Sequence, residues 1–202
     1  MRSDDFARNE LIIIGGAYKS GTSALCSATE AMGYENPASV TNPYEQGHGR
    51  AVPLYATREC SVARSWNRKL VAGTTTEAER IQRQLLFYLM EMTESLGTRI
   101  VIKDPYMRLV ASHWVCAASL LGIRQIRILI TVRAAQLVRQ SQERTPFMRW
   151  QMRKYPAIFE RLSAPLDRES YDRLVQLGAQ VQFVPYAQLL SEHTTKRDPI
   201  TR

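Results

Sequence analysis

The chain has 202 residues, of which 45% are hydrophobic and 23% charged, a composition that suits one globular domain with a sizeable core. Its net charge of +8 favours an anionic partner, such as a nucleotide, a nucleic acid, a membrane surface, or a sulfated or phosphorylated substrate. Three cysteines without C-x-x-C spacing predict neither a disulfide framework nor a zinc site. The chain has no apolar run of membrane-spanning length and no hydrophobic signal region at its N-terminus, so we expect a cytoplasmic protein.

The first predicted element is a buried parallel strand over residues 11–15, because its large aliphatic residues follow one another without polar alternation. A turn that contains glycine follows, and a helix is expected from about Ser23 to Met32. The first backbone N–H groups of a helix are unpaired, and the helix dipole places partial positive charge there. A strand, a tight turn and a helix N-terminus in this order therefore predict an anion site.

The residues of this turn strengthen the prediction of a phosphate-binding loop. Lys19 adds a full positive charge, and the hydroxyl groups of Ser20, Thr22 and Ser23 are able to donate to phosphate oxygens.

The turn differs from the loop of nucleotide-hydrolysing proteins, whose pattern is G-x-x-x-x-G-K-[ST]. Gly16 and Gly21 have the right spacing, but Thr22 occupies the position of the lysine, and Lys19 lies three residues earlier. Since the charge is relocated, we expect a different phosphate group to be bound. An ordinary β–α turn with an incidental lysine is the simpler alternative.

Residues 33–73 contain several Asn-Pro pairs and glycines, and they predict a long irregular segment of the kind that often carries function. Residues 74–77 then form a capping box, and a helix with a core-facing apolar stripe is expected to run to Leu96.

The rest of the chain alternates between strands and helices. Strands are expected over residues 99–103, 126–132 and 181–184; helices are expected over 113–121, from about 134, over 148–177 with a break near Pro165, and over 186–191. This alternation predicts an α/β fold, a three-layer αβα arrangement with a mainly parallel sheet whose ligands bind at the carboxyl ends of the strands.

Two further groups of polar residues follow predicted strands and so belong to the same edge. Lys103 and Asp104 end the second strand, and the plainest interpretation is that they pair with each other. Arg133 ends the third strand, and Ser141 lies eight residues later on the next helix, so that together they are able to bracket one phosphate.

These residues resemble those of the sulfotransferases that use 3′-phosphoadenylyl sulfate (PAPS). The loop Lys19–Ser23 resembles the 5′-phosphosulfate loop of that family, and Arg133 and Ser141 resemble its 3′-phosphate pair, with the same spacing. Residues 103–105 resemble the Lys-Asp-Pro strand end of the tyrosylprotein and many bacterial members. Tyr186 lies in a segment similar to the one that the family places near adenine.

The resemblance covers residues 11 to about 190 and implies a single sulfotransferase-like domain over residues 1–202, of a small bacterial type with a P-loop NTPase-like fold. It implies PAPS as cofactor, 3′-phosphoadenosine 5′-phosphate (PAP) as product, and no metal. Residues 33–73 and 144–173 are expected on the side of a small-molecule or glycan acceptor, which the positive charge allows to be anionic.

The resemblance also implies roles for individual residues. The lysines Lys19 and Lys103 would lie at the leaving oxygen. Ser20, Gly21, Thr22 and Ser23 would hold the 5′-phosphate, Arg133 and Ser141 the 3′-phosphate, and Tyr186 would lie near adenine.

The general base is less defined by the resemblance, because Pro105 stands where many cytosolic relatives have a histidine. Other relatives use a glutamate after the first helix, which makes Glu45 the first candidate and His48 the second, with Asp104 third.

Two other functions are compatible with the sequence. A small-molecule kinase on the same scaffold is disfavoured by the missing lysine after Gly21. A non-catalytic protein that binds a nucleotide or RNA would use the basic and aromatic residues of the stretch 144–154, although nucleic acid is the less expected partner.

Overall fold

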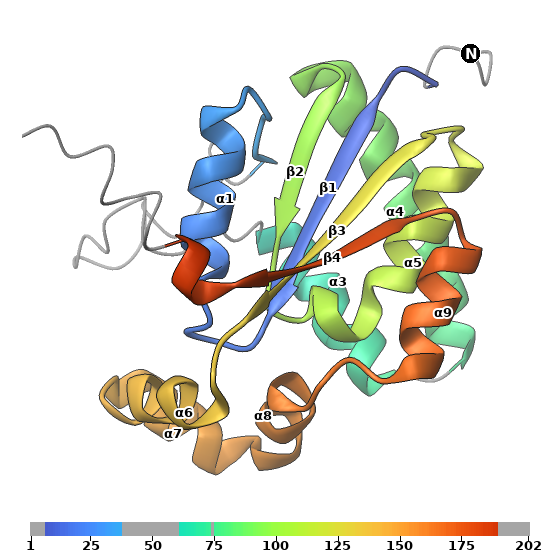
Figure 1. Cartoon of the computed structure of the whole chain (residues 1–202). Coiled ribbons are helices and arrows are strands. Elements are labelled where there is room, and N and C mark those ends of the chain that lie inside the picture. The colour runs from blue at the N-terminus through green and yellow to red at the C-terminus, as the bar shows by residue number, and fades with distance from the viewer. Residues whose placement is uncertain (1–6, 38–60, 74, 190–202) are drawn as a thin grey trace, which may run out of the picture.

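Four parallel strands form one sheet in the order β2-β1-β3-β4 (Figure 1). The computed structural model describes residues 7–37, 61–73 and 75–189. The strands are β1 (Glu10–Gly16), β2 (Arg99–Lys103), β3 (Gln125–Val132) and β4 (Gln180–Pro185). The helices are α1 (Thr22–Ala31), α3 (Ser61–Ala72), α4 (Thr75–Leu96), α5 (Met107–Leu120), α6 (Ala135–Glu143), α7 (Pro146–Lys154), α8 (Pro156–Ser163) and α9 (Arg168–Gln176), and residues 186–189 form a further helical turn.

The sheet is covered by helices on both faces, which confirms the predicted α/β class with a parallel sheet and is compatible with three-layer αβα packing. Leu11 and Ile13 point into a core formed with α3, α4, α5 and α9, while Ile12 and Ile14 point into a second core beneath α1. Since β1 is buried on both sides, neither face requires a polar residue, and this explains its unbroken aliphatic run.

Strand register places the three predicted site segments at one edge. Ile14 lies opposite Lys103 on β2 and Leu129 on β3, and Gly16 lies opposite Thr131. Because all the strands are parallel, the segments that follow β1, β2 and β3 leave the sheet at its carboxyl edge.

A third apolar cluster lies at this edge and joins the β1–α1 loop to helices α7 and α8. The Tyr18 ring stacks on Phe159 with 5.3 Å between centroids and meets Tyr106 edge-on at 6.2 Å, and Met148 and Leu162 complete the cluster. Figure 1 shows α6, α7 and α8 grouped beyond the strand ends.

The amino edge of the sheet carries a cluster of charged and aromatic residues that we call the amino-edge cluster: Glu10, Tyr34, Arg99 and Arg127. Arg99 lies 4.2 Å from the centroid of the Tyr34 ring, and its Nε lies 3.9 Å from Glu10 Oε2. Arg127 Nη2 lies 3.5 Å from the same carboxylate oxygen and donates to the Tyr34 hydroxyl, which in turn donates to Glu10. The Glu10 carboxylate on β1 thus forms ion pairs with one guanidinium group on β2 and one on β3, which links the three strands.

The prediction of an irregular segment over residues 33–73 is wrong for its last part, because α3 is a regular helix there. Ala63 is fully buried, and Trp66 and Leu70 pack against the main core, so the apolar residues follow helical spacing. Asn67 also accepts a hydrogen bond of 2.7 Å from Trp114 Nε1, which fixes α3 against α5.

Two other predicted boundaries differ from the structure. Helix α5 begins at Met107, six residues before the expected start at His113. The stretch expected as two helices broken near Pro165 contains three, because Pro146 and Pro156 each start a helix and Pro165 lies in the connection before α9.

Within the described ranges, no helix has both the length and the apolar character that crossing a membrane requires.

Candidate functional site

The loop between β1 and α1 has the backbone shape of an anion-binding loop. Lys19 adopts a left-handed conformation with φ of 68°, and Gly21, which precedes α1, adopts one with φ of 102°. Left-handed residues in such a turn bring successive N–H groups toward one concave side, where an anion binds. The first amides of α1 add to this concavity because they have no acceptor within the helix.

Four carbonyl groups of the same loop accept hydrogen bonds, two from the loop and α1 and two from distant segments. The carbonyl of Ala17 accepts from the Ser20 N–H at 3.1 Å, and that of Gly21 accepts from the Leu25 N–H at 3.0 Å. The carbonyl of Tyr18 accepts from Gln142 Nε2 at 2.9 Å, and that of Lys19 from Arg133 Nη1 at 2.9 Å. These bonds satisfy four carbonyl acceptors of the loop, which favours an anion over a cation as its ligand.

Glycines are required in the loop because other residues approach its backbone closely. A Cβ atom on Gly16 would lie 2.2 Å from Thr131 Oγ1, and one on Gly21 would lie 2.6 Å from the ring of Tyr186. The G-x-x-x-x-G spacing therefore reflects two close approaches, one to β3 and one to the helical turn after β4.

Arg133 contacts both the loop and the ring of Tyr186. The Arg133 guanidinium lies 4.3 Å from the centroid of the Tyr186 ring while Nη1 donates to the Lys19 carbonyl. Its Nε is buried and has no hydrogen-bond partner within the described part of the chain. A buried donor without a partner is costly, and an anionic ligand would satisfy it.

The structure divides the predicted loop residues into two groups. Lys19 is exposed and Ser23 is half-buried, so both are accessible at the loop. Ser20 is only 1% exposed, and its hydroxyl donates to the Ala17 carbonyl and contacts Thr131 Oγ1 at 2.5 Å. Ser20 therefore shapes the loop, and we correct the expectation that its hydroxyl contacts phosphate. Thr22, at the start of α1, is also buried, with 5% of its surface exposed.

Lys103 and Asp104 are buried at the end of β2. Lys103 is 2% exposed and lies on the same face of the sheet as Val101, toward α1, because side chains alternate along a strand. Asp104 Oδ1 accepts a hydrogen bond of 2.7 Å from the Tyr106 N–H, and the Asp104 N–H donates to the Ile14 carbonyl at 3.2 Å. Asp104 thus organises the turn into α5, which makes it a poor general base.

Ser141 lies half-buried on α6, next to Gln142, a residue whose role the sequence analysis did not predict. Its neighbour Gln142 is 3% exposed and reaches the Tyr18 carbonyl, so the helix that carries Ser141 is fastened to the loop. Thr131 was also missed, although a single hydroxyl residue in the otherwise aliphatic run 128–132 was a signal. Gln142 carried no such signal, because its contact spans 124 residues of sequence.

The two first candidates for the general base, Glu45 and His48, lie outside the described residues. His113 lies within α5, where its Nδ1 is 3.1 Å from Gln82 Oε1, and burial, with a smaller contribution from Arg173, lowers the pKa of its imidazole. It serves the packing of α5 on α4. Within the described ranges, no group of three or more His, Cys, Asp or Glu side chains is arranged to hold a metal ion.

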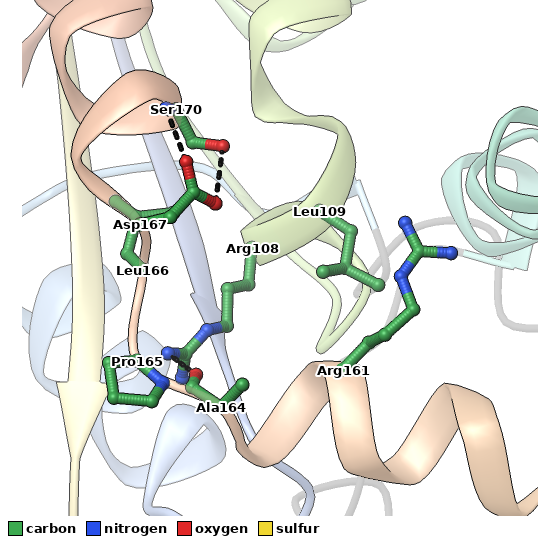
Figure 2. A pocket seen from close by; sticks show the side chains of 8 residues that line it. All are labelled: Arg108, Leu109, Arg161, Ala164, Pro165, Leu166, Asp167 and Ser170. Atoms are coloured by element: carbon green, nitrogen blue, oxygen red, sulfur yellow. Dashed lines mark hydrogen bonds between the residues drawn. The ribbon is translucent and has the colours of Figure 1, made fainter.

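A cavity of about 210 Å³ lies where α5, α8 and α9 meet (Figure 2). Arg108 crosses it from α5 and donates to the Ala164 carbonyl, and burial lowers the pKa of its guanidinium. Asp167 faces Ser170, whose N–H and hydroxyl donate to it at 2.7 and 2.9 Å, and these bonds lower the pKa of the carboxyl. The Arg108 contact fastens the α8–α9 connection to α5, and the Asp167 contacts cap the start of α9, so the cavity has a structural explanation.

No protein-family model matches the chain, and neither a curated protein nor a solved structure matches it. A function for the chain therefore has to be proposed from its own residues.

Proposed function

We propose that the protein is a PAPS-dependent sulfotransferase with a P-loop NTPase-like fold, which moves a sulfuryl group to a hydroxyl or amine of an acceptor. The observation that carries the proposal is the contact of Arg133 with the Lys19 carbonyl and the Tyr186 ring, which links three segments of the resemblance around one loop. Thr22 in place of a lysine after Gly21 distinguishes this loop from that of nucleotide hydrolases.

The residues present fit PAPS on two observations. The concave side of the loop offers backbone donors and the Lys19 ammonium, which suits the 5′-phosphosulfate. Arg133 Nε is a buried donor without a partner, and Arg133 makes no ion pair with a described acidic residue, which suits the 3′-phosphate. PAPS, when bound, supplies an activated sulfuryl group and a leaving phosphate.

Each residue then has a defined task. The loop amides with Thr22 and Ser23 bind the 5′-phosphate, and Lys19 neutralises charge at the leaving oxygen. The side chain of Lys103 lies on the α1 face of the sheet at the adjoining strand end, and we propose that it acts in the same way as Lys19.

Tyr186 holds Arg133 in position through its ring, and Ser141 is proposed as a second donor to the 3′-phosphate. Glu45, or His48 in its place, is proposed to take the proton of the acceptor hydroxyl as sulfur–oxygen bond formation proceeds. A cytoplasmic location remains a prediction from the sequence.

A second candidate function is non-catalytic binding of a nucleotide or RNA. It is favoured by the exposed side chain of Trp150, which is 52% accessible, with the Lys154 ammonium 4.9 Å from its ring. Aromatic and cationic side chains on one face are typical of surfaces that bind single-stranded nucleic acid. A kinase is the third candidate and is disfavoured by the loop sequence.

Calorimetric titration with PAP, with ATP plus magnesium as control, tests the proposal. We expect PAP to bind with micromolar affinity or better, and ATP to give no signal. The opposite preference would favour a kinase, and silence for both ligands would remove the cofactor assignment.

Single substitutions in the same titration and in an activity assay test which residues bind PAP and which one acts as the general base. Lys19→Ala is expected to weaken PAP binding without unfolding the protein, since its side chain is exposed. Glu45→Gln is expected to abolish sulfuryl transfer yet preserve PAP affinity; a fully active variant would direct attention to His48.

A further inference from the structure

The inward face of helix α6 combines one apolar and one polar side chain. Its buried residues are Val138 and Gln142, which lie four positions apart and so share a face, whereas the other side chains are exposed apart from the half-buried Ser141. A buried amide loses its hydration, which costs free energy unless the amide forms hydrogen bonds inside the protein. An apolar side chain would fill the position without that cost. The presence of glutamine therefore points to the hydrogen bond that it makes.

That hydrogen bond fixes the peptide plane in front of Lys19. Gln142 Nε2 donates to the carbonyl of Tyr18 at 2.9 Å. Because the C=O and N–H groups of a trans peptide point in opposite directions, this bond also fixes the direction of the Lys19 N–H. The Tyr18 ring is itself held by stacking on Phe159. Both the side chain and the carbonyl of the residue before Lys19 are thus held in place.

A second hydrogen bond fixes the peptide plane that follows Lys19. Arg133 Nη1 donates to the Lys19 carbonyl at 2.9 Å. The φ and ψ angles of a residue are the two rotations that relate its flanking peptide planes. The bonds from Gln142 and Arg133 therefore determine the backbone conformation of Lys19 together. Both donors belong to the segment 133–142 that follows β3, so this segment shapes the loop between β1 and α1.

The conformation that these bonds determine is a costly one. Among the described residues, Lys19 is the one residue other than glycine with a positive φ, at 68°. A left-handed backbone brings the Cβ atom close to the following carbonyl oxygen, so that a residue such as lysine keeps this conformation only where its surroundings impose it. Residues of this kind gather at ligand sites. Here the same conformation turns successive N–H groups toward one concave side.

We propose that Gln142 is a positioning residue of the anion-binding loop, which holds Lys19 in its left-handed conformation through the Tyr18 carbonyl. The loop then has its binding shape before the ligand arrives and loses less conformational freedom on binding. The inference rests on the proposed function for the identity of the ligand, whereas the role of Gln142 requires only an anion in the loop. The alternative role of Gln142 is to anchor helix α6 without acting on Lys19.

A double-variant cycle separates these two roles, with calorimetric titration of PAP as the measurement. Gln142→Met keeps the size of the side chain and removes the donor, and we expect the dissociation constant for PAP to rise roughly tenfold. In the Lys19→Gly background the left-handed conformation carries no steric penalty, so the same substitution is expected to raise the dissociation constant by less than about threefold. An equal rise in both backgrounds would show that Gln142 acts on the helix alone and would overturn the inference.

Gln151 on α7 provides the matched control. It is buried at 7% exposure, and within the described part of the chain its side chain makes no hydrogen bond to the loop. Gln151→Met is expected to leave the dissociation constant within about twofold of the parent value. Equal losses in the Gln151→Met and Gln142→Met variants would indicate a general disturbance of helix packing and would contradict the proposed role.

Thermal unfolding checks that each variant is folded. If Gln142→Met fails to fold, Gln142→Glu takes its place in the cycle, because an ionised carboxylate has a similar size and no hydrogen to donate. The same difference between the Lys19 and Lys19→Gly backgrounds is expected, and its absence would overturn the inference.

Inorganic pyrophosphate serves as a second probe and separates the inference from the proposed function. PAP binding that Gln142→Met leaves unchanged would overturn the inference while the cofactor assignment stands. Pyrophosphate binding that follows the expected cycle, in a protein that does not bind PAP, would support the role of Gln142 and remove PAPS as the cofactor. Silence for both probes would overturn both proposals.

Discussion

The two edges of the sheet carry the same pair of side chains in opposite electrostatic settings. At the amino edge, Arg99 lies 4.2 Å from the ring of Tyr34, and at the carboxyl edge Arg133 lies 4.3 Å from the ring of Tyr186. Glu10 balances the first arginine, whereas no described acidic residue pairs with the second, whose Nε remains unsatisfied. The same arginine–tyrosine contact thus closes a structural network at one edge and leaves charge for a ligand at the other.

The strongest test of this comparison removes each arginine in turn. Arg133→Ala is expected to weaken PAP binding by roughly tenfold to a hundredfold, because a charge-assisted contact to phosphate is lost. Arg99→Ala is expected to lower the melting temperature slightly and to leave PAP affinity unchanged. Calorimetric titration and thermal unfolding of both variants check this, and equal effects on PAP would contradict the division between the edges.

Gly21→Ala tests whether Tyr186 must approach the loop. The added Cβ would lie 2.6 Å from the Tyr186 ring at a backbone φ of 102°, so we expect a loss of about 1–3 kcal/mol in the free energy of unfolding, together with weaker PAP binding. Chemical denaturation measures the first effect. Gly97→Ala is the matched control, because Gly97 also has a positive φ but no atom within 4 Å of the added Cβ. If both variants lose the same stability, the contact with Tyr186 contributes nothing.

Lys19→Gly separates the charge of the loop from its backbone shape. Glycine adopts the left-handed conformation of residue 19 without a steric penalty, but it loses more entropy on folding. We therefore expect the free energy of unfolding to change by no more than about 1 kcal/mol. PAP affinity is expected to fall roughly tenfold because the ammonium group is lost. Retained affinity in this variant would indicate that the loop amides alone bind the phosphate.

Glu10→Gln makes the amino edge resemble the carboxyl edge by removing its carboxylate charge. Since Glu10 serves both Arg99 and Arg127 but is partly exposed, we expect a loss of up to about 1 kcal/mol in the free energy of unfolding. PAP affinity is expected to stay the same. A stability indistinguishable from that of the parent protein would show that the ion pairs of this cluster contribute little beyond its aromatic contacts.

The elements that sequence reasoning predicted well are those with a strong local pattern. The buried strand around Ile12 and Ile13, the strand over residues 99–103 and the long helix ending before Gly97 follow from unbroken aliphatic runs, an apolar stripe and a glycine terminator. Helix α3 was missed because the prolines and glycines that precede it suggest irregular structure. The early start of α5 was missed because Asp104 and Pro105 were interpreted as a functional strand end. In the structure, Asp104 accepts a hydrogen bond from the Tyr106 N–H and so organises the turn into the helix.

The candidate site was predicted in its parts but not in its contacts. Residues 19–23, Arg133 and Tyr186 were singled out from local motifs, and the parallel sheet accounts for their shared edge. Nothing local indicates that Gln142 holds the Tyr18 carbonyl, or that Ser20 turns inward to Thr131 across 111 residues of sequence. Such contacts arise when packing brings distant segments together.

The sequence by itself determined the four strands, the cationic loop after the first strand and the absence of a lysine after Gly21. These features depend on hydrophobic periodicity, backbone preferences and residue type, all of which act over a few neighbouring residues. Only the tertiary structure decided which donors remain available: it buried the Ser20 hydroxyl and set Arg133 between the Lys19 carbonyl and the Tyr186 ring. Hydrogen-bond partners and charge balance depend on segments that are distant in sequence and meet only when the strands pair with β1 in the folded protein. They therefore cannot be predicted from the local sequence.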